Sequence, residues 1–462
     1  MRLRVTTNTL LLLCGVLVLC SALLGMVYNA LPLSLAATES ARHSRQWHGV
    51  LRASNGGMVL VQHAKATLKD ANDSPHGSRG IVMCVHDGIL ALAVSLIREL
   101  RCLGNQEPIH VYHCFPDELS QESQDLLTRN NSNVQIVDVC VEMMEQNQII
   151  QESVALSFKS YWIKPLALYH TKLTEVLLLD ADAVFLKDPA SLRTLAGYQR
   201  TGTMFFYDRL YNQRKYFNTR MKDPRDSDKE QHLLKHIIET FDYKRFGLSG
   251  VGPSEQLLNS MAYREQTSHE QDSSVVAINK AKAGKAMEIL KYLITIERFN
   301  HVFSWGDKEA FWLAYELAHE DYYFSPWGLS LLNSVPNQDL ENHPDTLCGS
   351  MAHYVPVDAE STEAPEVLYV NGKALLDPFP LGVSKSLKTH KGRMFSIHPT
   401  HLTPRYRRAE MDLTKAHSSF QCLKGLGSTT LPSHFRVHLM RRRVHYLAVQ
   451  TQYFEPLDRC IV

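Results

Sequence analysis

The feature that most constrains this chain is a short apolar run that ends in two acidic residues. Residues 176–179 are Val-Leu-Leu-Leu, and Asp180 and Asp182 follow directly. A run of this kind predicts a strand buried on both faces of a sheet. Burying an ionised Asp costs several kcal/mol unless a cation or hydrogen bonds compensate for it. We therefore expect both carboxylates at the carboxyl end of this strand, the edge at which open α/β sheets bind ligands.

A hard divalent cation would explain the acidic pair, because carboxylate oxygens bind such ions and the ion can in turn hold a diphosphate. The alternative is a capped strand end, since Asp-x-Asp is a short pattern that also occurs at residues 226–228. That second copy lies in a polar stretch and predicts only a solvated surface. The apolar run before Asp180 and the turn at residues 186–189 favour the metal site for Asp180 and Asp182.

The N-terminal residues predict a membrane anchor. Arg2 and Arg4 are followed by no charged residue until Glu39, and residues 10–27 are mostly apolar. A spanning helix needs about 20 apolar residues, whereas the core of a signal peptide has roughly 7 to 15. The length of the run favours an anchor, and the alternative is a signal peptide cleaved near Ala36.

The expected organisation follows from this anchor. We expect a cytoplasmic tail at residues 1–8, a transmembrane helix at 9–31 and a polar stem at 32–78. The remainder is expected in the lumen, because positive charge stays on the cytoplasmic side. The lumenal fold is expected at residues 79–380, and the basic residues 381–462 form a C-terminal extension whose structure the sequence does not predict.

The composition argues against two broad classes of protein. The 462 residues are 44% hydrophobic and 21% charged with a formal net charge of +1, which argues against nucleic-acid binding and against disorder. Nine cysteines are present, and Cys14 and Cys20 fall in the expected anchor. The other seven are an odd number. A lumenal location therefore predicts disulfides and at least one unpaired thiol.

Strand and helix patterns alternate along the expected lumenal fold. The predicted strands are 81–85, 109–113, 134–139, 176–179, 204–208 and 274–279, and the predicted helices are 90–103, 117–127, 161–170, 233–241, 281–297 and 307–318. This alternation predicts an α/β fold with parallel strand pairing. Residues 211–245 are charged and aromatic, which is typical of a solvated insertion, with a substrate lid as the alternative.

Six spaced motifs occur in order between residues 79 and 375. They are Gly80-Ile81-Val82-Met83-Cys84, Ile97-Arg98-Glu99-Leu100, Tyr161-Trp162-Ile163-Lys164-Pro165-Leu166-Ala167-Leu168, residues 176–189, His269-Glu270-Gln271-Asp272-Ser273, and Gly306-Asp307-Lys308-Glu309-Ala310-Phe311-Trp312. This combination resembles the fungal-type Golgi α-mannosyltransferases of glycosyltransferase family 71. The resemblance implies a GT-A fold, in which helices flank a Rossmann-like mixed sheet. Two departures stand out: Ser274 replaces an expected glycine, and the basic C-terminal region lies outside the likeness.

The resemblance also implies an activity. Members of that family transfer mannose from GDP-mannose to a mannose of a glycan or glycoprotein, with retention of the α configuration and with Mn²⁺ as the usual metal. It further implies a single-pass type II protein of the Golgi membrane. The same motifs are more distantly similar to the glycogenin-type transferases, so a UDP-sugar donor is the alternative. A lumenal lectin or an inactive relative is another, although a pure glycan binder has no need of a diphosphate-bound metal.

Two basic residues are candidates to complete the diphosphate site. A nucleotide-sugar transferase must neutralise the charge that builds on the departing diphosphate, and a divalent ion held by Asp180 and Asp182 would do so. Lys164 lies one short helix before the strand and is a candidate to reach the phosphates, although a surface lysine is the simpler interpretation. His353 is a candidate third metal ligand, with a structural histidine as the alternative.

Four further residues are candidates for contact with the sugars. Gln271 and Asp272 precede a predicted strand, a position suited to contacting the donor near its anomeric carbon. Asp272 could be a nucleophile or stabilise an oxocarbenium-like centre, or the departing phosphate could take the acceptor proton on the same face, and the sequence does not choose. Asp307 and Glu309 begin a predicted helix, where acids either bind acceptor hydroxyls or serve as ordinary partners of the helix dipole.

Overall fold

The computed structural model describes residues 78–129, 133–149, 151–250, 252–335, 344–357, 366–378, 397–410, 418–419, 422–453 and 460. These residues belong to one unit, Ala71–Val462. The expected tail and anchor, and all of the expected stem before residue 78, lie outside the described residues. Within the described ranges, no helix is both long enough and apolar enough to cross a membrane.

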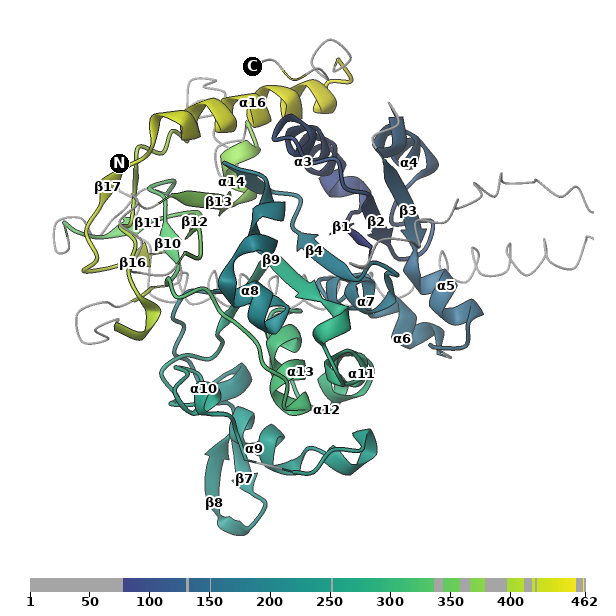
Figure 1. Ribbon diagram of the computed structural model, residues 1–462, viewed down its shortest axis with the longest axis vertical. Helices are drawn as coiled ribbons and strands as arrows, with labels where there is room; N and C mark the ends of the chain where they lie inside the picture. The colour runs from purple at the N-terminus through teal and green to yellow at the C-terminus, as the bar shows by residue number, and fades with distance from the viewer. Residues whose placement is uncertain are drawn as a thin grey trace, which may run out of the picture. The chain divides into compact units, whose positions relative to one another are not determined.

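A six-stranded mixed sheet forms the centre of this unit (Figure 1). In spatial order its strands are β3 (Val134–Asp138), β2 (Ile109–His113), β1 (Arg79–Cys84), β4 (Glu175–Leu179), β9 (Gln271–Asn279) and β6 (Thr203–Tyr207). The first four are parallel, and β9 runs antiparallel to β4 and β6. The α/β class and the mixed, Rossmann-like sheet are confirmed, whereas the prediction of uniformly parallel pairing is wrong for β9. Because β9 begins beside the end of β6, it must run in the direction opposite to β6.

Alternate residues of the central strands enter two separate cores, as the pleat of a strand requires. In β4, Val176 and Leu178 join one cluster, which contains helices α7 (Ile163–His170) and α13 (Ala310–Ala318). Leu177 and Leu179 join the other, which contains helix α3 (Leu90–Cys102) and a second sheet. All four side chains are at most 1% exposed. The predicted strand buried on both faces is therefore confirmed.

Helices pack on both faces of this sheet (Figure 1). They are α3 (Leu90–Cys102), α4 (Gln121–Thr128), α5 (Val139–Glu145), α6 (Glu152–Leu156), α7 (Ile163–His170), α8 (Ala196–Thr201), α9 (Leu233–Thr240), α10 (Glu255–Leu258), α11 (Ala286–Tyr292), the π-helix η7 (Leu293–Glu297), α12 (Arg298–Asn300), α13 (Ala310–Ala318), α14 (Lys373–Leu376) and α16 (Ser433–Gln450). The 3₁₀ turns are η1 (Asp87–Ile89), η3 (Pro189–Thr194), η4 (Tyr216–Asn218), η5 (Tyr243–Phe246), η6 (Lys280–Lys282) and η9 (Arg408–Glu410). All six predicted helices have a counterpart among these elements.

A second sheet begins directly after the acidic pair. It is antiparallel, and its four strands in spatial order are β10 (Ser330–Leu331), β12 (Met351–Tyr354), β13 (Val367–Asn371) and β5 (Ala183–Phe185). Because β4 ends at Leu179 and β5 starts at Ala183, Asp180 and Asp182 lie in the turn between the two sheets. This connection fixes both sides of the turn.

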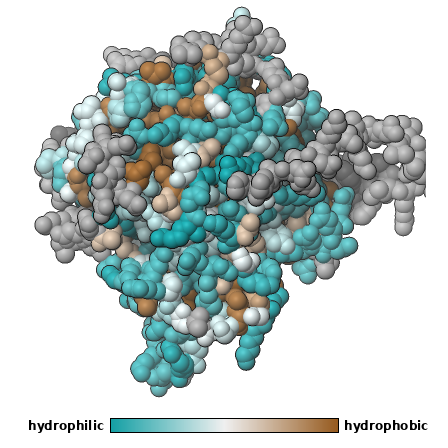
Figure 2. Space-filling model, viewed as in Figure 1, coloured by the Kyte–Doolittle hydropathy of each residue, from teal (hydrophilic) through white to brown (hydrophobic). Residues whose placement is uncertain are grey.

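Shorter strands form the periphery. They are the hairpin β7 (Arg220–Asp223) and β8 (Asp226–His232), the small sheet of β11 (Leu347–Cys348), β16 (Cys422–Leu423) and β15 (Ser418–Ser419), and the pair β14 (His401–Leu402) and β17 (Thr429–Thr430). The second Asp-x-Asp copy begins β8, where Ser227 and Asp228 are exposed. The face of this hairpin seen in Figure 2 is predominantly hydrophilic, as expected for a solvated surface.

The described part of the C-terminal region contributes to the core. Helix α16 packs along α3 (Figure 1), and its Phe435, Leu439 and Tyr446 are at most 5% exposed. Disulfides tie Cys102 to Cys460 and Cys348 to Cys422. The boundary expected at residue 380 itself lies outside the described residues.

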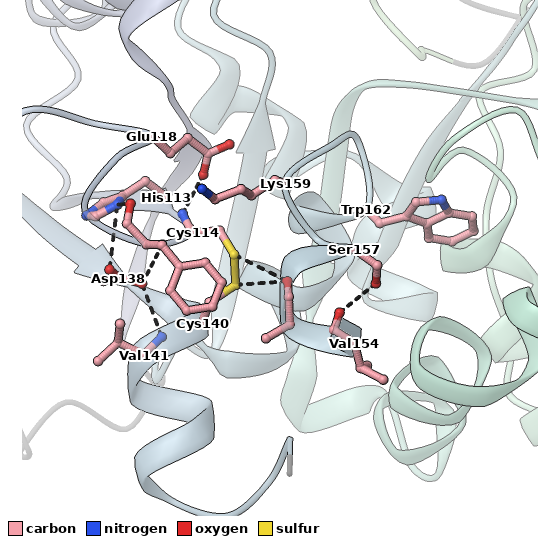
Figure 3. Close-up of a disulfide and its surroundings, with 12 residues drawn as sticks. His113, Cys114, Glu118, Asp138, Cys140, Val141, Val154, Ser157, Lys159 and Trp162 are labelled. Carbon is pink, nitrogen blue, oxygen red and sulfur yellow. Dashed lines mark hydrogen bonds and ion pairs between the residues drawn. A yellow bond between two sulfur atoms is a disulfide. The ribbon is translucent and has the colours of Figure 1, made fainter. Parts of the chain in front are cut away.

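A third disulfide, Cys114–Cys140, joins the end of β2 to α5 (Figure 3). Both of its sulfur atoms lie 3.5 Å from the carbonyl oxygen of Ala155. Cys84 is the free cysteine of the described residues, so the prediction of disulfides with an unpaired thiol is confirmed. Three disulfides indicate an oxidising compartment.

Candidate active site

Three strand ends bring polar residues to one edge of the central sheet. Asp180 follows β4 and Asp208 follows β6, while Gln271 and Asp272 begin the antiparallel β9. The register pairs Leu179 with Val275 and Tyr207 with Gln271, so the start of β9 lies at the ends of β4 and β6. The carboxyl ends of β1 and β4 lie at this same edge. The chain builds the sheet from β1 through β2 to β3 and then places β4 on the other side of β1. Open sheets bind their ligands at such a change in strand order.

One group of charges at this edge surrounds Lys164. Its amine lies 2.9 Å from Oδ1 of Asp180 and 3.2 Å from Oδ2 of Asp307, and it donates to the backbone and side-chain oxygens of Ser273 at 2.9 and 3.0 Å. Burial lowers the pKa of Lys164, but the two carboxylates outweigh it and raise that pKa above its ordinary value. Lys164 is therefore held in its charged form.

The acidic pair itself has too little positive charge around it. Burial raises the pKa of Asp180 to about 7, helped by Asp182 and Asp307 and opposed by Lys164. Burial also raises the pKa of Asp182, although backbone N–H groups, including that of Lys373 at the start of α14, oppose this. The side chain of Asp180 is nevertheless 30% exposed, and Asp182 is also partly exposed. The two carboxylates thus carry unbalanced negative charge at a partly exposed position.

The turn that carries these carboxylates is held from behind by Arg442 of α16. The guanidinium is fully buried and donates to the carbonyl oxygens of Ala181 at 3.0 Å, Ala183 at 3.2 Å and Leu92 at 3.3 Å. Two of these bonds flank Asp182. The C-terminal helix therefore fixes the backbone of the Asp180–Asp182 turn.

The donor set of this turn suits a hard divalent cation such as Mn²⁺. Such ions are bound by one or two carboxylates together with substrate phosphates, and a cation would supply the positive charge that the pair lacks. Within the described ranges, no group of three or more His, Cys, Asp or Glu side chains is arranged to hold a metal. The predicted three-ligand set of Asp180, Asp182 and His353 is therefore not formed by the protein alone.

A second group of charges surrounds Asp208 and is balanced internally. Its carboxylate is ion-paired with Lys308, lies 3.5 Å from Nε2 of His269 and accepts the N–H of Arg209 at 2.6 Å. Burial opposes ionisation, but Lys308 and His269 lower the pKa of Asp208 well below its usual range. From the other side, Arg408 pairs with Glu270 at 3.3 Å.

Asp272 has its hydrogen bonds satisfied by neighbours from both sheets. Its Oδ2 lies 2.8 Å from Nε2 of His353 and 3.5 Å from the hydroxyl of Tyr369. The same oxygen accepts a hydrogen bond from the hydroxyl of Ser274 at 2.5 Å. Burial opposes ionisation of the Asp272 carboxyl, but the bond with His353 lowers its pKa. His353, predicted as a metal ligand, instead binds Asp272 and stacks on Tyr369 with ring centroids 4.8 Å apart. Ser274, noted as a departure, is one of the donors that hold Asp272.

Gln271 and Glu309 are both fully buried but differ in their partners. Among the described residues, neither amide atom of Gln271 has a hydrogen-bond partner. Glu309 accepts the backbone N–H groups of Glu270 and Gln271 at 3.2 Å and the indole N–H of Trp312 at 2.6 Å. Burial raises the pKa of Glu309 to about 8. Glu309 thus fixes the start of β9, whereas the buried amide of Gln271 makes no hydrogen bond to the described residues.

A family model described as "Mannosyltransferase putative" matches residues 78–354. The chain belongs to this mannosyltransferase family. The match covers all of the charged groups described above except those supplied by residues 369–442.

Two curated relatives from Saccharomyces cerevisiae indicate how far the similarity extends. "Probable alpha-1,3-mannosyltransferase MNT4" is 25% identical over 297 residues, which cover 61% of this chain and 48% of the relative. "Alpha-1,3-mannosyltransferase MNN1" is 25% identical over 316 residues, which cover 64% of this chain and 40% of the relative. The matches thus span less than half the length of these relatives.

Among solved structures, the S. cerevisiae mannosyltransferase Ktr4p in complex with GDP matches at a TM-score of 0.35 and 11% identity. It covers 54% of this chain and 69% of the solved one. A likeness this low carries no argument about the site of this family member.

Sequence reasoning missed three residues that shape the site. Asp208 ends a predicted strand, so the rule that located Asp180 could have located it. Lys308 stands in a quoted motif, but its partner is 100 positions away and the pairing leaves no local signal. Arg442 lies in the basic C-terminal stretch, whose structure the sequence does not predict.

Proposed function

We propose that this chain is a metal-dependent α-1,3-mannosyltransferase that transfers mannose from GDP-mannose to a mannose-containing glycan. The observation that carries the proposal is the pair Asp180 and Asp182, held in a fixed turn at the ligand-binding edge of the sheet with unbalanced negative charge. Family membership supports the sugar and the linkage.

The donor diphosphate is bound at the group around Lys164. Asp180 and Asp182 would hold Mn²⁺ or another divalent cation, which supplies positive charge to the departing diphosphate. Lys164 adds a fixed positive charge beside Asp180, and Asp307 keeps its amine oriented from the other side. This arrangement gives Asp307 a positioning role, in place of the contact with acceptor hydroxyls expected from its sequence position.

The donor sugar is bound at the start of β9. The unpartnered amide of Gln271 offers both a donor and an acceptor of hydrogen bonds to the sugar. Asp272 acts as a fixed anion that stabilises positive charge at the anomeric carbon, because its many hydrogen bonds make it a poor nucleophile. The acceptor oxygen then bonds to the anomeric carbon as the bond to the diphosphate breaks, and the departing phosphate oxygen takes the acceptor proton. This route retains the α configuration.

The reaction is proposed to take place in the lumen of the Golgi. Three disulfides support an oxidising compartment, and the sequence supports an anchor at residues 9–31 with the fold on the lumenal side.

The decisive experiment is a donor panel with the full-length protein. GDP-mannose, GDP-fucose, UDP-glucose and UDP-galactose are offered with Mn²⁺ and an α-mannobiose acceptor, and the product linkage is determined by NMR. We expect transfer from GDP-mannose only, with an α-1,3 product, and loss of transfer on chelation that added Mn²⁺ restores. A preference for a UDP-sugar would move the chain to the glycogenin-like alternative, and glycan binding without turnover would make it an inactive relative.

A further inference from the structure

Three partly exposed aromatic side chains lie beside the Asp208–Lys308 pair. Trp305 is 41% exposed, and its ring centroid lies 6.0 Å from that of Tyr216 and 6.3 Å from that of Tyr211. We call these three residues the aromatic shelf. Aromatic rings that gather at a surface offer an apolar face with a defined orientation to a ligand.

The aromatic shelf adjoins the candidate active site. Tyr211 stacks on His269 with ring centroids 5.8 Å apart and the planes 13° from parallel, and His269 in turn lies 3.5 Å from Asp208. Trp305 is followed two positions later by Asp307 and then by Lys308. Lys308 also influences the hydroxyl of Tyr216, whose pKa is raised by burial and by Tyr211 but lowered by the lysine. The shelf therefore forms the border of the charged groups.

The loop that carries Tyr211 and Tyr216 is rigidly attached. Tyr211 N–H donates to Oγ1 of Thr267 at 3.1 Å, and Ser268 N–H donates to the carbonyl of Tyr211 at 2.7 Å. The hydroxyl of Ser268 both accepts from the N–H of Gln213 and donates to its carbonyl. The loop is therefore held in place before any ligand binds, which lowers the entropy cost of binding.

Buried rings and unusual backbone angles fix the orientation of the shelf. Phe217 and Phe303, both at most 1% exposed, stack with centroids 6.4 Å apart and join the two segments that carry the shelf. Tyr216 has φ of +51°, a left-handed conformation that is costly for a bulky residue and is typical of ligand-binding positions. Gly306 has φ of +72°, and a Cβ there would meet Tyr161 at 3.0 Å. The turn after Trp305 thus requires glycine.

We propose that the aromatic shelf binds the pyranose ring of the acceptor glycan. The C–H face of a hexose packs on aromatic rings, while its hydroxyls reach the polar groups beside the shelf. A neutral sugar suits a surface on which Asp208 and Lys308 already compensate each other. This inference rests on the proposed function and adds to it the place at which the acceptor is held.

The test measures acceptor binding apart from catalysis. The full-length protein is titrated with α-mannobiose by calorimetry in the presence of Mn²⁺ and GDP, and steady-state KM values are measured for acceptor and donor. Trp305→Ala should weaken mannobiose binding and raise the acceptor KM at least tenfold, with the donor KM changed less than twofold. Trp305→Phe should retain most of the affinity, because it keeps an apolar ring.

The matched control is Tyr453→Ala, which removes a 77% exposed ring that follows α16 and should leave both KM values unchanged. Thermal unfolding checks that each variant is folded. Unchanged mannobiose binding in folded Trp305→Ala and Tyr211→Ala would overturn the shelf, while transfer from GDP-mannose would still support the proposed function. If the wild-type protein transfers no sugar, the calorimetric titration still decides: lost mannobiose binding in Trp305→Ala supports the shelf, and retained or absent binding in the wild type refutes it.

Discussion

Two acidic groups at the same sheet edge have opposite electrostatics. Around Lys164, the carboxylates of Asp180 and Asp307 share one amine, with Asp182 as a further acid close to Asp180, and the pKa of Asp180 rises to about 7. Around Asp208, one carboxylate has a lysine, a histidine and a backbone N–H, and its pKa falls. Burial raises the carboxyl pKa in both groups, so the difference comes from the neighbours: Asp182 and Asp307 raise the pKa of Asp180, whereas Lys308, His269 and Arg209 all lower that of Asp208.

This difference distinguishes acids that need a bound ligand for compensation from acids that the fold already compensates. A buried carboxylate with enough partners is a finished part of the fold, whereas one without them is stabilised by whatever cation the site accepts. We therefore interpret the Asp180–Asp182 side as the place of chemistry and the Asp208 side as a fixed wall. The predictions below separate the two groups by activity and by stability.

The largest effect is expected from the acidic pair. Asp180→Asn and Asp182→Asn should each lower the transfer rate on the order of 10² or more, because the diphosphate loses its bound cation. The fold should remain intact, since each substitution removes an unbalanced charge. Transfer rate and thermal unfolding are measured on the same samples.

Asp226→Asn is the matched control, because it alters the same pattern in an exposed hairpin where Asp226 pairs with Lys229 at 2.9 Å. It should change neither rate nor stability. Full activity of Asp182→Asn at saturating Mn²⁺ would refute the metal assignment.

The balanced group should respond in stability. Lys308→Met leaves the Asp208 carboxylate buried with a reduced set of partners, which should lower the free energy of unfolding by about 3 kcal/mol. Chemical denaturation measures this change. The double variant Asp208→Asn with Lys308→Met should recover part of the loss, because it removes the unpaired charge, and equal destabilisation of the single and double variants would contradict the balanced interpretation.

An intermediate effect is expected from Arg442, which holds the turn without touching substrate. Arg442→Met should weaken binding of Mn²⁺ with GDP by roughly 10- to 100-fold, as is usual when a group that orients a metal ligand is lost. Arg442→Lys should recover a part, since a lysine can reach one carbonyl. Arg436→Met, an exposed arginine on the same helix, is the control. Unchanged Mn²⁺ affinity in a folded Arg442→Met protein would show that α16 only packs against the turn.

The smallest effect is a pH dependence that belongs to the unbalanced group alone. A cation must displace the proton of Asp180, so Mn²⁺ affinity should fall below about pH 7, by at most about tenfold per pH unit. Without metal the sign reverses: a raised carboxyl pKa stabilises the fold at low pH, and this stability is lost as the pH rises through about 7. Calorimetry between pH 5 and 8 measures both trends, and a flat Mn²⁺ profile would contradict the raised pKa.

Local patterns were enough to predict the strands of the central sheet and the exposed edge at Asp180. Burial of residues 176–179 can be predicted from these residues alone, because every side chain among them is apolar. The second sheet could not be predicted in this way, since β5 pairs with β13 from about 185 positions away and its strands are short.

Arg442 illustrates a different limit. A buried arginine needs carbonyl acceptors, and those of Ala181 and Ala183 come from a distant part of the chain. Its own neighbours in sequence, Arg441 and Arg443, give no local signal of this burial. The role of His353 was likewise decided by Asp272 across the two sheets.

The dependence of the Asp180–Asp182 turn on α16 also has a consequence for the order of events during synthesis. A ribosome makes the turn more than 250 residues before it makes Arg442. The nascent chain can therefore form the central strands early, but the Asp180–Asp182 turn acquires its support only after α16 has been translated and has docked on α3. Newly made chains would pass through a folded but inactive stage, and a ribosome that stalls before codon 442 would release a protein that lacks this support.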